Sequence, residues 1–215
     1  MKKNLLRRFW DFIWNDNSLL SWVVSIFLTL FLIYFVIYPG ASLILDSDYP
    51  VVAIISTSME HSLNSNDNGY FMCGVLFQRY FRPDFDRWWS ICGDWYEEEV
   101  NISKSDFKEF RFKNGLYKGD IIVSSGKNAS VGDVIIFRAN SPIPIIHRVV
   151  DIFEEDGERF FVAKGDNNPD VNEGIGEHKI HEDNVLGIAK MRIPYLGYVR
   201  IIFSNTINFI VSFIS

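Results

Sequence analysis

The second half of the chain contains five short apolar runs: IIVSS (121–125), VIIF (134–137), IIHRVVDIF (145–153), RFFVAK (159–164) and VLGIAKMRI (185–193). Gly-Asp or Asn-rich turns separate these runs, and an earlier run, VVAII (51–55), leads into a serine-rich turn. Short runs of β-branched and aromatic residues between such turns are typical of strands. The pattern therefore predicts a mainly β domain.

A long apolar segment precedes these runs. From Ser18 to Leu45 there is no Asp, Glu, Lys or Arg. Its core, LLSWVVSIFLTLFLIYFVI (19–37), is long enough at about 1.5 Å per residue to cross a hydrocarbon layer of about 30 Å. A cleavable signal would have a shorter apolar region, so we expect a transmembrane anchor. The basic residues before it predict a cytoplasmic N-terminus, with the rest of the chain outside: Lys2, Lys3, Arg7 and Arg8.

The segment from 64 to 114 differs in composition from its surroundings. It mixes charged with aromatic residues and holds three of the six tryptophans: Trp88, Trp89 and Trp95. Because flexible linkers are rich in Gly or Ser, we interpret this segment as an insertion with a small core of its own. The alternative is that its aromatic side chains lie at the lipid headgroups. The only two cysteines, Cys73 and Cys92, lie here, and either a disulfide or two free thiols is open.

These features divide the 215 residues into five parts. The parts are a basic N-terminus (1–17), a membrane anchor (18–45), a β-rich domain (46–63 and 115–198), the insertion (64–114) and an apolar C-terminal segment (199–215). We expect the last part to be a membrane-associated helix. Two glycosylation sequons, at Asn101 and Asn128, fit an outside location. Lys and Arg number 21 against 27 Asp and Glu, a net charge of −6, which argues against a nucleic-acid partner.

Three segments carry residues suited to nucleophilic catalysis. Ser56 and Ser58 follow the first predicted strand, so in an extended chain Ser58 could attack a carbonyl while the Ser56 hydroxyl stabilises the oxyanion. His147 lies within an apolar strand and offers a general base at neutral pH. The turn KGDNNPD (164–170) offers carboxylates that could orient an imidazole. Each segment also has an ordinary interpretation: a polar turn, a core histidine and favourable turn chemistry.

Taken together, these segments resemble the membrane-bound type I signal peptidases, in particular their archaeal and endoplasmic-reticulum branch. The resemblance rests on five ordered motifs: STSM (56–59), GDVIIF (132–137), IHRVV (146–150), KGDNNPD (164–170) and RIPYLGYV (192–199). It covers nearly the whole chain outside the insertion. Bacterial members resembling this pattern have a lysine base where this chain has His147, which indicates the branch. The resemblance implies an antiparallel β domain of the signal-peptidase type on an N-terminal transmembrane helix.

The resemblance also implies an activity, that of a membrane-bound serine endopeptidase which removes N-terminal signal peptides from exported preproteins. Ser58 would attack the scissile carbonyl after small residues, of the Ala-x-Ala type, and form an acyl-enzyme, with His147 as general base. Ser56 and the amide of Ser58 would form the oxyanion hole. Met59 would help line the pocket for a small side chain. The reaction implies no cofactor and no metal.

Two positions depart from the family pattern. His61 stands where relatives commonly have proline, and because it is close to the nucleophile it is a rival for the role of base. At the later position where relatives often carry the aspartate partner of the histidine, this chain has Asn172. Asp166 and Asp170 are therefore the candidates for the acid that orients His147, with the amide oxygen of Asn172 as a further alternative.

The expected partners are preproteins with signal peptides, the lipid bilayer and the protein-translocation machinery. The expected location is the cell membrane or the endoplasmic-reticulum membrane, with the catalytic domain on the outer or lumenal side. The missing standard acid and the large insertion leave a second class of function open. This is a catalytically inactive, membrane-anchored β module that binds exported proteins or belongs to a translocation complex.

Overall fold

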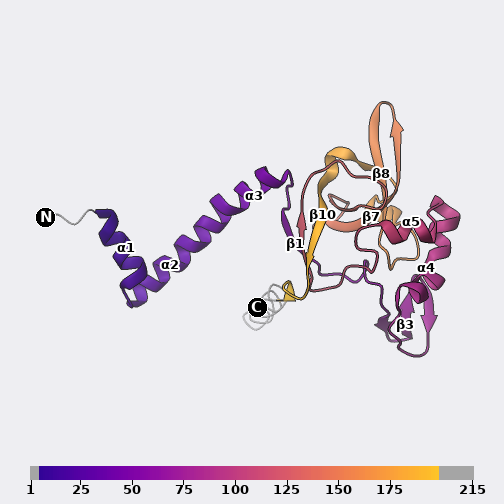
Figure 1. Cartoon of the computed structure of the whole chain (residues 1–215), viewed down its shortest axis with the longest axis horizontal. Coiled ribbons are helices and arrows are strands. Elements are labelled where there is room, and N and C mark those ends of the chain that lie inside the picture. The colour runs from indigo at the N-terminus through magenta and orange to yellow at the C-terminus, as the bar shows by residue number, and fades with distance from the viewer. Residues whose placement is uncertain (1–4, 199–215) are drawn as a thin grey trace. The chain divides into compact units, whose positions relative to one another are not determined.

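The computed structural model describes residues 5–198, so the apolar C-terminal segment predicted at 199–215 lies outside the described residues. The chain divides next to Leu45 into a helical unit and a β unit, which are described separately (Figure 1).

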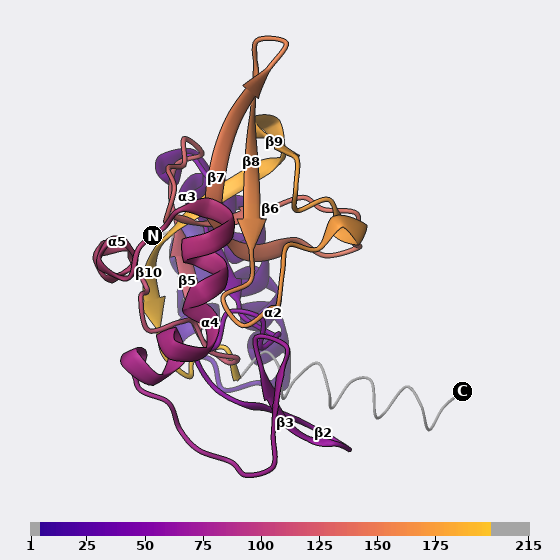
Figure 2. The ribbon, with the colours of Figure 1, turned by 90° about the vertical axis from the view of Figure 1, so that its right-hand side faces the viewer.

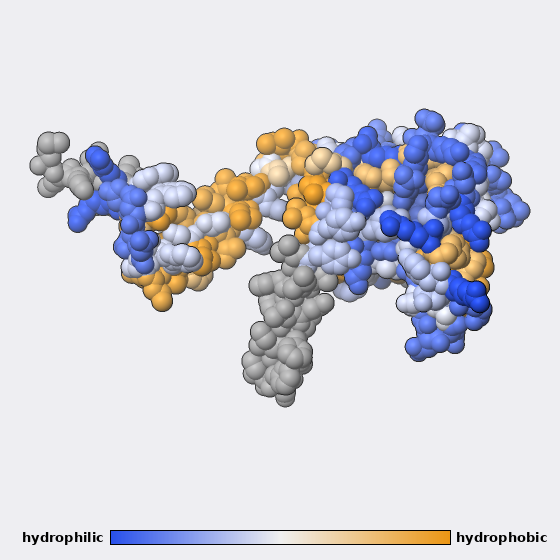
Figure 3. Space-filling view, turned by 60° about the horizontal axis from the view of Figure 1, so that its bottom comes forward, coloured by the Kyte–Doolittle hydropathy of each residue, from blue (hydrophilic) through white to orange (hydrophobic). Residues whose placement is uncertain are grey.

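The helical unit contains a short helix, α1 (Leu5–Asn15), and a continuous helix of 27 residues, Leu19–Leu45. The long helix consists of α2 (Leu19–Leu32), a π-helical turn (Ile33–Ile37) and α3 (Tyr38–Leu45). The wide turn precedes Pro39, whose ring would clash with the carbonyl four residues back in a regular helix. The most apolar part of the long helix has a mean hydropathy of 2.5, and Figure 3 shows apolar surface along it. Its length and composition suit a membrane crossing.

The β unit is built on a seven-stranded sheet whose neighbouring strands are antiparallel, in the order β1-β5-β10-β6-β7-β8-β9. The strands are β1 (Val51–Ala53), β5 (Ile121–Ser124), β6 (Val134–Phe137), β7 (Ile145–Glu155), β8 (Glu158–Lys164), β9 (Ile180–His181) and β10 (Val185–Ile193). The five apolar runs of the second half of the chain form β5, β6, β7, β8 and β10. The mainly β fold class is therefore confirmed.

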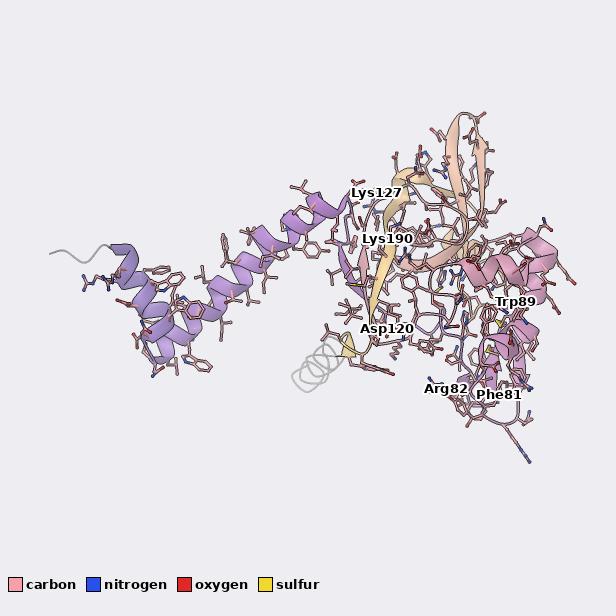
Figure 4. All side chains as sticks on the ribbon, viewed as in Figure 1. Phe81, Arg82, Trp89, Asp120, Lys127 and Lys190 are labelled. Atoms are coloured by element: carbon pink, nitrogen blue, oxygen red, sulfur yellow. A yellow bond between two sulfur atoms is a disulfide. The ribbon has the colours of Figure 1, made fainter. Side chains whose placement is uncertain are left out.

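A small second sheet and two helices lie in the segment predicted as an insertion. They are β2 (Asn64–Asn66), β3 (Gly69–Met72), β4 (Val75–Phe77), α4 (Phe85–Val100) and α5 (Lys104–Glu109). A disulfide joins Cys73, in the turn between β3 and β4, to Cys92 on α4. Trp89 lies on α4, and Phe81 lies in the segment that leads into it (Figure 4).

An aromatic cluster forms the core of this segment. Trp88, Trp89 and Tyr96 of α4 and Phe107 of α5 are all buried, with ring centroids 5.0 to 6.1 Å apart. These tryptophans therefore form a small core, as interpreted from the sequence, whereas Trp95 is half-buried at its edge. Figure 2 shows α4 against the sheet beside β7.

The strand β7 separates two packed regions of the β unit. Successive residues of a strand point to opposite faces of its sheet. Val149 packs on one face with Phe161 of β8, and Val150 packs on the other face with the aromatic cluster. The neighbours His147 and Arg148 also lie on opposite faces of the strand: His147 lies on the same face as Val149, and Arg148 lies on the same face as Val150.

Candidate active site

Ser58 lies in the turn after β1, where the chain leaves the sheet. Its hydroxyl oxygen is 2.8 Å from Nε2 of His147 on β7 and 3.1 Å from the hydroxyl oxygen of Ser56. The carbonyl of Ser58 accepts a hydrogen bond from the amide of Asn167 at 2.7 Å, which holds the main chain of the turn. The fold thus brings together the two serines and the histidine that the sequence analysis singled out.

The other ring nitrogen of His147 contacts a carboxylate that is not among the candidates predicted from the sequence. Nδ1 of His147 is hydrogen-bonded to Oε1 of Glu177, whose side chain is fully buried. The second carboxylate oxygen, Oε2, accepts a hydrogen bond from the amide of Asn172 at 2.7 Å. A carboxylate on Nδ1 holds an imidazole with Nε2 directed at the nucleophile. Ser58, His147 and Glu177 therefore form a hydrogen-bonded series.

Glu177 reaches the histidine because the loop after β8 turns back onto that strand. Gly176, with a φ of 80°, ends the short 3₁₀ turn Glu173–Ile175 in the left-handed conformation that glycine favours. The carbonyl of Glu177 then accepts the amide of Ala163 on β8 at 2.9 Å. The sequence signal is the pair Gly174 and Gly176 just before this glutamate, and such a pair by itself indicates a solvated loop.

Asp166 does not contact His147. Its carboxylate accepts hydrogen bonds from Arg148 (Nε at 2.9 Å and Nη2 at 2.7 Å), from Nε2 of His61 at 3.0 Å and from the hydroxyl of Tyr96 at 3.1 Å. Burial opposes its charge, but the attraction of Arg148 and the hydrogen bonds from His61 and Arg148 outweigh burial and hold the pKa of Asp166 far below its usual range. Asp166 is the counter-ion of an arginine on the opposite face of β7, which is why it is not available to the histidine.

Asp170 and Asn172 also lie apart from the imidazole. The carboxylate of Asp170 accepts a hydrogen bond from the indole N–H of Trp95 at 2.9 Å. The side-chain oxygen of Asn172 accepts a hydrogen bond from the amide of Gly174 at 3.0 Å. Its main chain contacts Glu177: the amide of Asn172 donates to the Glu177 carboxylate at 2.7 Å, and its carbonyl accepts the amide of Glu177 at 3.3 Å. The geometry thus assigns neither residue to the role of acid predicted from the sequence.

His61, the rival base, is buried and directed away from Ser58. Its ring stacks on Trp88, with centroids 3.6 Å apart, while its Nε2 bonds Asp166. Burial lowers the pKa of His61, and the hydrogen bond and charge of Asp166 offset this only in part. The ring is therefore a neutral member of the Asp166 network at neutral pH.

A groove of about 330 Å³ opens beside Ser58 and His147. Its apolar wall residues come from the chain around β1, from β6 and from the start of β7: Val52, Ile54, Ile55, Met59, Ile136, Ile143, Ile145 and Ile146. Strand β1 forms one edge of the sheet. An apolar groove beside an edge strand suits an extended peptide. Among residues 5–198, no group of three or more His, Cys, Asp or Glu side chains could hold a metal ion.

A serine, a histidine and a carboxylate hydrogen-bonded in series beside such a groove define a site of the serine-peptidase class. In this chain the site stands on a β unit that follows an apolar helix long enough to cross a membrane.

Comparisons with known proteins identify catalytic subunits of signal peptidase complexes as relatives. The chain is 27% identical over 169 residues to the signal peptidase complex catalytic subunit sec11 of Schizosaccharomyces pombe, covering 76% of this chain and 72% of the relative. It is 25% identical over 174 residues to the subunit SEC11C of Homo sapiens, covering 79% and 65%. It is 32% identical over 100 residues to SEC11 of Komagataella phaffii, covering 41% and 58%.

The chain is thus a homologue of the catalytic subunits of signal peptidase complexes. It spans less than two thirds of the length of the human and Komagataella relatives. No family model and no solved structure matches it. The resemblance to the type I signal peptidases of the endoplasmic-reticulum branch is confirmed.

Proposed function

We propose that this chain is a membrane-bound signal peptidase, a serine endopeptidase that removes N-terminal signal peptides from exported preproteins. The observation that carries the proposal is the hydrogen-bonded series of Ser58, His147 and Glu177 beside the apolar groove. The relatives named above are catalytic subunits of signal peptidase complexes, which supports the same reaction.

The reaction begins at the hydroxyl of Ser58. Its oxygen bonds to the scissile carbonyl carbon while Nε2 of His147 takes the proton, and Glu177 stabilises the imidazolium that forms. The hydroxyl of Ser56 and the amide of Ser58 donate hydrogen bonds to the oxyanion. His147 then gives its proton to the leaving amine as the C–N bond breaks, which leaves an acyl-enzyme. A water that loses its proton to His147 hydrolyses this ester and restores Ser58.

The groove selects the residues before the cut. Its apolar walls, with Met59 among them, accept small uncharged side chains, so the favoured site is of the Ala-x-Ala type. A substrate strand that runs along the free edge of β1 would place its carbonyl at Ser58, and its main chain would be held by hydrogen bonds of the sheet type.

The setting of the reaction is the endoplasmic-reticulum membrane or the cell membrane. The basic residues before the apolar helix favour a cytoplasmic N-terminus and therefore a β unit on the lumenal or outer side. Partners are preproteins, the bilayer and the translocation machinery. Because its relatives are subunits of complexes, we also expect partner subunits.

The inactive-module alternative rests on the missing standard acid and on the large insertion. Glu177 supplies a carboxylate at the required nitrogen of His147, so the first of these two reasons no longer holds.

Cleavage of a preprotein with an Ala-x-Ala site by the full chain, in detergent or vesicles, tests the proposal. We expect the wild type to release the mature protein and Ser58→Ala and His147→Ala to fail while folded. Ser65→Ala and His178→Ala, two exposed positions away from the groove, are the matched controls and should cut normally. Normal cutting by Ser58→Ala would show that Ser58 is not the nucleophile. No cutting by the wild type on several substrates would favour the alternative of an inactive binding module.

A further inference from the structure

The inserted segment is connected to the active site through the turn that follows β8, residues 165–170. The Cys73–Cys92 disulfide joins the β3–β4 turn to α4, so that these elements form one covalently closed unit. Cys92 is buried with an exposed fraction of 2%, and Cys73 is half-buried. We call this unit, which consists of the β3–β4 turn, α4 and the disulfide between them, the clasp.

The clasp contacts the 165–170 turn at two residues, Asn167 and Asp170. The amide of Cys73 donates to the main-chain oxygen of Asn167 at 3.3 Å and to its side-chain oxygen at 3.4 Å. The indole N–H of Trp95, on α4, donates to Asp170 at 2.9 Å. One contact comes from each side of the disulfide, which links the two sides covalently.

The same turn holds the reacting residues. The amide of Asn167 donates to the carbonyl of Ser58 at 2.7 Å, and its side-chain nitrogen donates to the carbonyl of Ser62 at 3.0 Å. Gly165 passes so close to His147 that an added Cβ would lie 2.9 Å from Nε2. The position of the turn therefore determines both the approach of Ser58 and the space around its base.

We propose that the Cys73–Cys92 disulfide is a redox control of the active site. The inference rests on the proposed function of Ser58. In the oxidised chain the clasp holds Asn167, and Asn167 holds Ser58 in reach of His147. When a dithiol attacks the disulfide at Cys73, the less buried of the two cysteines, two electrons and two protons pass to the disulfide. The chain gains two thiols, and the reagent becomes a disulfide.

Reduction removes the covalent link between the β3–β4 turn and α4, and it loosens the hold of the Cys73 amide on Asn167. The peptidase is then active in an oxidising compartment and impaired in a reducing one, which agrees with a β unit outside the cytoplasm. Cys73 and Asn167 act here as positioning residues, since neither touches the reacting atoms.

The inference is tested by reacting the full chain with a probe that acylates the active serine. The final extent of acylation counts the competent sites, and the rate of acylation reports the reactivity of each site. We compare oxidised wild type, wild type treated with dithiothreitol, and a double variant, Cys73→Ala with Cys92→Ala. We expect reduction to slow acylation per site by about 10- to 100-fold and reoxidation to restore it. Hydrogen exchange at the Asn167 amide should accelerate on reduction, because that amide is bonded to Ser58.

The double variant is the matched control, since the chain contains no cysteines besides these two. Its acylation should be slow with and without the reductant. Unchanged acylation in the reduced chain and in the double variant would overturn the inference while leaving the proposed function intact. A smaller extent of acylation at an unchanged rate would show that the disulfide supports folding alone, and this result would also overturn the inference. An oxidised wild type that neither reacts with the probe nor cuts a preprotein would refute the proposed function itself.

Discussion

The reactivity of Ser58 depends on which ring nitrogen of His147 carries the proton. Nδ1 must donate to Glu177 so that Nε2 is free to accept the proton of the serine. Glu177 is fully buried, and the amide of Asn172 holds its other oxygen. The geometry of the base is therefore established before a substrate binds, which removes part of the entropic cost of the reaction.

We predict that Glu177→Gln lowers kcat by about 10²- to 10⁴-fold while KM stays within about threefold of the wild-type value. The glutamine NH₂ group donates to Nδ1 and thereby selects the tautomer whose Nε2 carries a proton. Steady-state cleavage of a preprotein measures both constants. Glu173→Gln, an exposed carboxylate in the same loop, is the control and should behave as wild type. A kcat equal to that of the control would show that Glu177 does not orient the histidine.

Among the elements, α4 and the sheet are joined by a buried charged network. The guanidinium of Arg148, on β7, forms a two-point pair with Asp166 and lies 4.7 Å from the ring centre of Phe107. Tyr96 of α4 donates to the same carboxylate. Replacing one member of such a network leaves its partner charged, buried and unpaired.

We predict that Asp166→Asn lowers the free energy of unfolding by about 3–5 kcal/mol, because Arg148 loses its counter-ion. The difference in the free energy of unfolding between this variant and the wild type is constant near neutral pH. It shrinks below about pH 4, where the aspartate takes up a proton in the unfolded chain. Folded Asp166 does not take up that proton, because its pKa is far lower, so the wild type loses stability as the pH falls. Unfolding of the full chain in detergent at several pH values measures the effect.

Asp86→Asn is the matched control for this prediction. Asp86 pairs with Lys104 on the surface, at 3.0 Å, where an ion pair contributes little to stability. Equal losses of stability in the two variants would contradict the role given to Asp166.

The strands could be predicted from the sequence because each apolar run and its turn signals are local. The proximity of Ser58 and His147 could be predicted from ordered motifs. Glu177 could not be predicted, because its contact with His147 depends on the path of the whole loop between β8 and β9. Asp166 was misassigned because its direction is determined by Arg148, a partner on the far face of the sheet.

At the scale of the whole molecule, the two units suit different surroundings. The helix from Leu19 to Leu45 is apolar along its length, whereas the β unit exposes polar positions such as Asn101 and Asn128, both in glycosylation sequons. A chain of this kind has one unit in lipid and the other in water.

We predict that the chain, translated with endoplasmic-reticulum microsomes, is glycosylated at Asn101 and Asn128, because the basic N-terminus stays in the cytoplasm and the β unit enters the lumen. A mobility shift that an endoglycosidase removes would report this. Asn101→Gln and Asn128→Gln should each remove one glycan. An unglycosylated chain whose β unit is digested by protease added outside intact microsomes would contradict the orientation.

The alternation of side chains along β7 limits how the strand can evolve. His147 and Arg148 are neighbours, yet one serves the groove and the other the aromatic cluster. Deleting a single residue early in the strand would shift its register by one and exchange the two faces. The imidazole would then be buried among aromatic rings, and a guanidinium would stand beside the serine. Insertions and deletions can therefore accumulate in the loops around β7, but within the strand they would remove the base and the core arginine in one step.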